Sequence, residues 1–354
     1  MAFSVRHILS FLERNALALA MVVGVAGFPF FRHLTELLPP LIFLMLFFTF
    51  CKINPADLRL RKWHWMVLFV QLALGIGIYY CIEYFLHHYS NLTNGDIAII
   101  SQGLMLCIVM PTASAAAIIA GKLGGSIQNL TSFTLLSNVA TAVIVPVFFP
   151  IVNPDAGIEF WEAFWMILRK ITPLLICPFF AAWALRLIYN AYQHNRGQQK
   201  QFTLSSTWAG MPFYIWVFTL VILMGDLTYS LIHQQYSLWT IAILCVGSLI
   251  TCLMQFGLGK WIGYCFPAGT KGSDYKDVLI NPAAANYSMQ KVSQITAGQA
   301  FGQKNTTLAI WMAQAYLVPI ASMAPAAYII WQNLFNSIQL TIAGRAAEKN
   351  KKGA

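Results

Sequence analysis

The sequence predicts an all-α polytopic membrane protein of about ten transmembrane helices, arranged as two inverted five-helix repeats. Its 354 residues are 58% hydrophobic and only 10% charged, whereas soluble proteins average about a quarter charged residues. This length accommodates roughly ten spans of about 20 residues with short loops. Two of the apolar stretches are interrupted by polar residues at corresponding places in the two halves. Such paired interruptions are the best indication of a transporter binding site that a sequence offers.

Five spans are expected in each half of the chain. The first five are residues 16–31, 37–50, 63–86, 97–120 and 130–150. Residues 155–170 combine acidic and aromatic side chains and are expected to form an interfacial helix on the membrane surface. The remaining spans are 171–189, 208–229, 238–265, 287–314 and 317–340, with a polar linker at 190–206. Within this single membrane domain, residues 1–195 hold the first repeat, the interfacial helix and span 6, which starts the second repeat. Residues 196–354 hold spans 7 to 10.

The distribution of charge predicts the orientation in the membrane. The net charge is +10, and most Lys and Arg residues fall in the tails and in the loops after even-numbered spans. By the positive-inside rule both termini are cytoplasmic, in a multi-pass protein of the plasma (inner) membrane. An odd number of spans per half means that the second half enters the membrane inverted. The positive charge therefore flanks a bilayer and does not indicate nucleic-acid binding.

Signs of metal binding or catalysis are not found in the sequence. The seven cysteines are odd in number, mostly lie in apolar spans and form no CxxC pair. Neither a disulfide framework nor a thiolate metal site is indicated, and no cofactor is expected. The interrupted stretches hold no histidine or acid, and no GxSxG or HExxH pattern occurs. We therefore do not expect an enzyme.

The clearest functional signal is the stretch 298–313, GQAFGQKNTTLAIWMA, whose polar middle lies inside an apolar region. An ionisable side chain at membrane depth is costly, so it is a functional-site hypothesis by default. Irregular backbone is tolerated there only where it is buried or lines a cavity. We expect span 9 to break near the midplane; if the break lies toward one face, Lys304 instead snorkels to water. The site candidates at this break are Gly302, Gln303, Lys304, Asn305 and Thr306.

A second stretch, 110–121, reads MPTASAAAIIAG and matches the first. Pro111 removes a backbone donor, so span 4 is expected to kink or stop there. Thr112 and Ser114 are then placed to cap a new half-helix with their hydroxyls.

Span 5 follows directly and carries hydroxyl and amide side chains in its first half. Such side chains either line the same cavity or make ordinary hydrogen bonds between helices. The site candidates among them are Thr134, Ser137 and Asn138.

At these stretches the chain resembles the bile acid:sodium symporter family, as a divergent, bacterial-type member. That family carries T-A-S-N after the break in its fourth helix and E-x-G-x-Q-N in its ninth. The segment Thr112-Ala113-Ser114 matches the first motif, and Gly302 and Asn305 match the second. The resemblance implies ten spans in two inverted repeats, with core and panel sub-domains and with broken helices 4 and 9 crossing each other.

The resemblance also implies roles for residues outside the two motifs. Gln71 on span 3, in a Val-Gln-Leu context, resembles a glutamine that the family uses near its ion site. Thr134 and Ser137 fall roughly where the fifth helix of the family contributes hydroxyls.

Three positions that hold sodium in the family differ in this chain. The glutamate of the ninth helix falls on Ala300, the glutamine before the asparagine on Lys304, and the asparagine after T-A-S on Ala115. A sodium site needs oxygen ligands and a compensating carboxylate. Two unit charges about 4 Å apart interact by about 4 kcal/mol at an effective dielectric of 20, so a protonated Lys304 would weaken bound sodium by roughly three decades. We therefore doubt a sodium site and expect Lys304 to take the place of the sodium and attract an anion.

The sequence thus favours a secondary transporter of a small organic anion, carboxylated or bile-acid-like, that works by alternating access. Because burial disfavours the charged form of a lysine, Lys304 could also load and release a proton, which leaves a uniporter and a proton-coupled carrier open. One alternative is sodium-coupled symport, with a rearranged ion site from Thr112, Ser114, Thr134 and Gln303. Another is a membrane receptor that does not transport.

Overall fold

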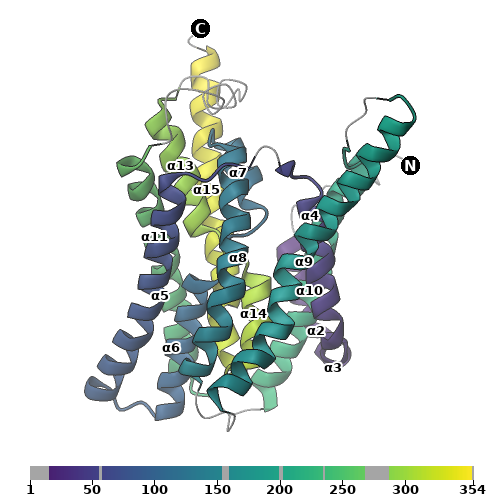
Figure 1. Ribbon diagram of the computed structural model, residues 1–354. Helices are drawn as coiled ribbons and strands as arrows, with labels where there is room; N and C mark the ends of the chain where they lie inside the picture. Colours follow the sequence, from purple (N-terminus) through teal and green to yellow (C-terminus); the bar gives the residue numbers. More distant parts are fainter. Residues whose placement is uncertain are drawn as a thin grey trace, which may run out of the picture. The chain divides into compact units, whose positions relative to one another are not determined.

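The computed structural model describes residues 16–55, 58–153, 159–198, 202–233, 236–267 and 287–352. Within these ranges every regular element is a helix (Figure 1). Six helices of this described part are long and apolar enough to cross a bilayer. The chain is thus an all-α, membrane-embedded protein, whereas the count of ten spans stays a prediction. It divides into two compact units, Met1–Ile53 with Lys170–Tyr236, and Asn54–Arg169 with Ser237–Ala354.

The first unit is built on α10, which packs against α2 and α4. Its elements are α2 (Ala16–Ala26), α3 (Phe28–Phe31), the 3-10 helix η1 (Arg32–Leu37), α4 (Leu38–Phe50), most of α9 (Phe160–Asn195) and α10 (Ser206–His233). The expected span 16–31 is divided, because the helix stops at Ala26 and a new one begins after Gly27. Prolines occupy the first turns of α3 and α4, where the missing N–H has no helical partner to lose.

The expected interfacial helix at 155–170 is wrong as a separate element. Residues 154–158 lie outside the described part, and from Phe160 the chain forms the first turns of α9 without interruption. Pro173 and Pro178 lie inside this helix and do not end it, since membrane helices accommodate proline through local adjustment and neighbouring donors.

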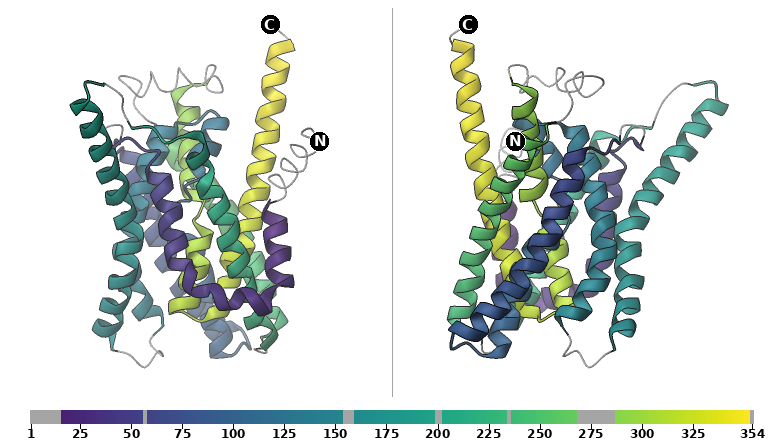
Figure 2. Two further views of the ribbon diagram at one scale, coloured as in Figure 1. Left: turned by 90° about the vertical axis from the view of Figure 1, so that its right-hand side faces the viewer. Right: turned by 60° about the vertical axis from the view of Figure 1, so that its left-hand side comes forward.

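The second unit contains the interrupted stretches. Its elements are α5 (Lys62–Tyr89), α6 (Asn94–Val109), α7 (Ala116–Lys122), α8 (Ile127–Val152), α11 (Leu238–Cys265), α13 (Met289–Gly302), α14 (Thr306–Tyr316), the 3-10 helix η5 (Pro319–Ser322) and α15 (Met323–Lys352). Helix α5 packs on α6, and α11 packs on α13. The start of α13 and the C-terminal end of α15 lie at the same end of this unit (Figures 1 and 2).

Small residues bring α11 and α13 close together. A Cβ added at Gly259 would lie 2.5 Å from the Ala297 carbonyl, and one at Gly263 would collide with the Ser293 carbonyl. Such glycines four residues apart let two membrane helices approach to backbone contact. The position of α13, and hence of its broken end, depends on this contact.

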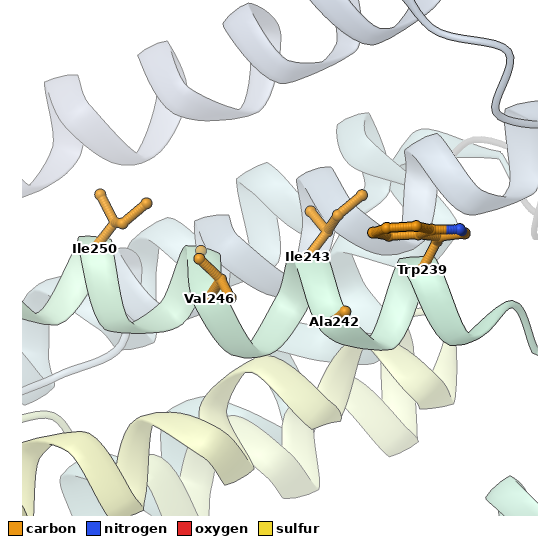
Figure 3. Close-up of a pocket in the computed structure, with 6 residues that line it drawn as sticks. Trp239, Ala242, Ile243, Val246 and Ile250 are labelled. Atoms are coloured by element: carbon orange, nitrogen blue, oxygen red, sulfur yellow. The ribbon is translucent and has the colours of Figure 1, made fainter.

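The exposed face of α11 is an apolar stripe with aromatic residues at both ends. Trp239 is 75% exposed and Trp261 is 60% exposed; the two are about 33 Å apart at 1.5 Å per residue. That distance matches a hydrocarbon core of about 30 Å, with aromatic side chains at the level of both interfaces. Figure 3 shows the first half of the stripe, a shallow groove of about 330 Å³ lined by Trp239, Ala242, Ile243, Val246, Gly247 and Ile250.

Candidate binding site at the interrupted helices

Both predicted helix interruptions are confirmed. Helix α6 ends at Val109 and α7 begins at Ala116, while α13 ends at Gly302 and α14 begins at Thr306. The residues that follow α6 and α13, Met110 and Gln303, have extended backbone. All four half-helices belong to the second unit.

The two extended segments pair with each other. Thr112 and Lys304 form an isolated antiparallel bridge, in which the Ala113 N–H donates to the Gln303 carbonyl (3.0 Å) and the Asn305 N–H donates to the Pro111 carbonyl (2.8 Å). Backbone groups freed by one break thus bond to those freed by the other. Irregular backbone is stable at membrane depth only when it is satisfied in this way.

Side-chain amides satisfy the carbonyls at the end of α6. Pro111 has no N–H, so the Cys107 carbonyl one turn earlier loses its helical donor. The Gln255 Nε2 of α11 donates to that carbonyl at 3.0 Å. From α5, the Gln71 Nε2 donates to the Val109 carbonyl at 2.9 Å. Two helices therefore hold the broken end of α6 through equivalent amide contacts.

Helix α15 performs the same role at the end of α13. The Tyr328 hydroxyl donates to the Gly302 carbonyl (2.8 Å), and the Lys304 N–H donates to the Gln332 Oε1 (3.0 Å). The Gln303 Nε2 donates to the Asn336 Oδ1 at 3.4 Å. Tyrosine and amide side chains on one face of α15 therefore fix the main chain at Gly302 and Lys304 and the side chain of Gln303.

Lys304 places a buried amine at this crossing. Its side chain is 1% exposed, and its Nζ has no hydrogen-bond partner within the part of the chain that the structure describes. The Nζ lies 5.0 Å from the centre of the Phe301 ring. The amine does not snorkel to water.

The ends of α6 and α13 point their carbonyls into the crossing. The C-terminal end of a helix carries about half a negative elementary charge. Two such ends together amount to about one negative charge, which one monovalent cation can compensate. These helix ends would offset part of the cost of burying an ammonium there, even without a carboxylate.

The other predicted site residues fall into two groups. Thr112 and Ser137 are part of the crossing, since the Thr112 N–H donates to the Ser137 Oγ at 3.0 Å. Asn305 caps α14 by accepting from the Leu308 N–H at 3.2 Å, and Thr306 is the buried first residue of that helix.

Thr134 and Asn138 bond instead within α8. The Thr134 hydroxyl donates to the Leu130 carbonyl, and the Asn138 Nδ2 donates to the Thr134 carbonyl. These contacts are internal to the helix, while the Asn138 Oδ1 is buried without a partner among the described residues.

The expected capping of α7 by Thr112 and Ser114 is wrong. Helix α7 begins after Ala115, with no side-chain cap, and the Thr112 hydroxyl donates to the Ala300 carbonyl at 2.6 Å. The crossing brings the Ala300 carbonyl directly against the Thr112 hydroxyl, and the hydroxyl points toward that carbonyl.

Four residues of the crossing escaped the sequence analysis. Each is a polar side chain in an apolar span, and that polarity is the signal that would have identified all four. Gln332 and Asn336 are in addition four positions apart, on one face of a helix. The four are Gln255, Tyr328, Gln332 and Asn336.

No protein-family model matches this sequence, and none of the curated proteins compared with it matches.

Proposed function

We propose that this chain is a secondary transporter of a small organic, carboxylated anion that works by alternating access, in which Lys304 substitutes for a bound sodium ion. The resemblance of Thr112–Ser114 and Gly302–Asn305 to the motifs of the bile acid:sodium symporter family supports this assignment. The proposed setting is the plasma (inner) membrane, with both termini cytoplasmic.

One observation carries the proposal: the Lys304 amine is enclosed by protein and has no hydrogen-bond partner among the described residues. A structural lysine would be expected to bond to a carbonyl or a carboxylate, because a buried unpaired charge is costly. An amine left without a partner at the meeting point of two broken helices is available for a ligand. Such residues inside membrane segments commonly mark substrate or ion pathways.

The helix ends at the crossing can accommodate one cation and, beside it, one anion. In broken-helix transporters, the C-terminal ends of half-helices coordinate cations and the N-terminal ends face anionic substrate groups. The Lys304 ammonium compensates the ends of α6 and α13, which a sodium ion would otherwise do. The N-terminal end of α14, capped by Asn305, adds backbone donors and a positive dipole end for a carboxylate.

The division of the chain into two units supports inverted repeats. The first unit combines predicted spans 1, 2, 6 and 7, and the second combines spans 3–5 and 8–10. Each unit therefore contains spans at corresponding positions of both halves. This is the composition expected of panel and core sub-domains when the two halves of the chain are inverted repeats.

The test is a thermal-shift measurement on the purified chain against a panel of organic carboxylates, from acetate to cholate, with and without sodium at two pH values. A carboxylate at 100 times its Kd should stabilise the protein by about 2.7 kcal/mol, with no added effect of sodium. Lys304→Gln, which restores the residue of the related motif, should lose carboxylate stabilisation and gain a response to sodium. A sodium response in the unmodified chain that persists in Lys304→Ala would refute the substitution.

Sodium-coupled symport is the second candidate, and one observation favours it. The Gln71 Oε1 and the Gln255 Oε1 are buried without hydrogen-bond partners among the described residues, and amide oxygens are ligands that hard cations accept. Uptake into proteoliposomes distinguishes the two, because symport requires a sodium gradient and the proposed mechanism does not.

A further inference from the structure

The end of α11 that carries Trp261 also carries a lysine. Lys260 is exposed, and its Nζ lies 5.4 Å from the centre of the Phe335 ring of α15. A Cβ added at Gly298 of α13 would lie 2.8 Å from the Lys260 Cγ. The missing side chain at Gly298 therefore lets the lysine stem lie across α13, which holds the amine where α11, α13 and α15 meet.

A second ammonium is nearby. Lys291, in the first turn of α13, is exposed. The side chain of the adjacent Gln290 donates to the Tyr264 carbonyl of α11 at 3.4 Å, so Lys291 lies at the same end of the α11–α13 contact as Lys260. Within the described ranges, neither lysine has a carboxylate oxygen within 4.0 Å. Two like charges thus share one end of the α11–α13 contact, and an anion between them would relieve their repulsion.

The surroundings of the two lysines are those of a membrane interface. Trp261 and Tyr264 are exposed aromatic residues at the end of the apolar stripe, at the level where aromatic side chains border the headgroups. Along the stripe toward the membrane centre, a Cβ at Gly257 would meet no heavy atom within 4 Å. This leaves a notch between the larger exposed side chains of Leu253 and Trp261.

We propose that Lys260 and Lys291, together with Trp261 and Tyr264, bind the phosphate headgroup of an anionic phospholipid. The lysines bind the phosphate, the aromatic rings hold the glycerol level, and an acyl chain follows the stripe past Gly257. Basic sites between membrane helices bind anionic headgroups in this way. A soluble phosphate compound would use the lysines but not the apolar stripe. The inference depends only on membrane embedding and is independent of the transport proposal.

Native mass spectrometry of the full chain in detergent tests the site by comparing retention of phosphatidylglycerol and phosphatidylcholine. The unmodified chain should prefer phosphatidylglycerol. A contribution of about 1 kcal/mol per lysine corresponds to about a fivefold loss of that preference in Lys260→Gln or Lys291→Gln. Lys122→Gln, at an exposed lysine that ends α7, is the matched control and should change nothing.

A further variant separates geometry from charge. Gly298→Ala keeps both lysines but displaces the Lys260 stem, so it should also reduce the preference for phosphatidylglycerol. Unchanged preference in the Lys260→Gln/Lys291→Gln double variant would overturn the proposal. Displacement of the lipid by millimolar glycerol phosphate would overturn the choice of a lipid over a soluble phosphate. Because Lys260 and Lys291 are both exposed, their variants should fold normally.

Discussion

Replacing Lys304 by methionine keeps the length of the side chain and removes its charge. Lys304 is 1% exposed, and its buried amine has no hydrogen-bond partner among the described residues. Burying an ammonium costs several kcal/mol in proteins. The Phe301 ring at 5.0 Å offsets about 2 kcal/mol of that cost, and the helix ends offset about as much. If the burial cost is taken as about 6 kcal/mol, the net effect of the charge on the ligand-free protein is a destabilisation of about 2 kcal/mol.

Lys304→Met should accordingly stabilise the ligand-free protein while removing its response to anions. A gain of about 2 kcal/mol corresponds to a rise in melting temperature of about 4–8 °C for a folding unit of about 150–250 residues. Loss of a charge interaction of about 4 kcal/mol should weaken carboxylate binding by roughly three decades. A residue that destabilises the empty protein and is required for binding is typical of a functional site.

The assay is a thermal melt in detergent, with and without the best carboxylate of the panel. Lys122→Met, at an exposed lysine of the same unit, is the control and should leave both readings unchanged. The reasoning would be refuted if Lys304→Met melted several degrees lower than the unmodified chain and still responded to the carboxylate. That result would make Lys304 a structural residue.

Two further predictions concern the packing that holds the crossing. Gln255→Leu leaves the Cys107 carbonyl without a donor and should cost about 1–3 kcal/mol; combining it with Pro111→Ala, which restores an N–H, should cost less than the sum of the two single changes. Additive costs in chemical denaturation would contradict this coupling. Gly263→Leu forces a side chain into the backbone of α13 and should lower the melting temperature by several degrees, whereas Gly257→Leu, where a Cβ meets no heavy atom within 4 Å, should have little effect. Equal effects of the two leucines would show that α11 and α13 do not need backbone contact.

The helix breaks could be predicted because their causes are local. Pro111 removes a donor, and a run of polar residues after Gly302 cannot continue a lipid-facing helix. Proline alone does not end a helix in this chain, since Pro173 and Pro178 lie inside α9; Pro111 is distinguished by the matching interruption in span 9. The capping of α7 could not be predicted, because the partner of the Thr112 hydroxyl is the Ala300 carbonyl, 188 residues away in sequence. The direction in which the Thr112 side chain points depends on this distant carbonyl, and only the packed structure shows it.

The composition of residues 155–170 predicts a separate interfacial helix, and this prediction is wrong, because the chain from Phe160 onward belongs to α9. Acidic and aromatic residues from Phe160 onward are typical of a surface helix. A helix of 36 residues nevertheless continues through them, since no residue between Phe160 and Asn195 forces the chain to stop. Amphipathic composition describes the surroundings of a helix and does not determine where it ends.

By itself the sequence determined that the chain is helical and lies in a membrane, where two of its helices break, and that a lysine sits at one break. These properties follow from composition, proline and charge, which act within a few residues. The tertiary structure alone decided that the two breaks pair with each other, that amides of α5 and α11 satisfy the carbonyls of α6, and that the Lys304 amine is enclosed without a partner among the described residues. Each of these depends on residues far apart in the chain, because at membrane depth a backbone group freed by a break must find its partner on another helix.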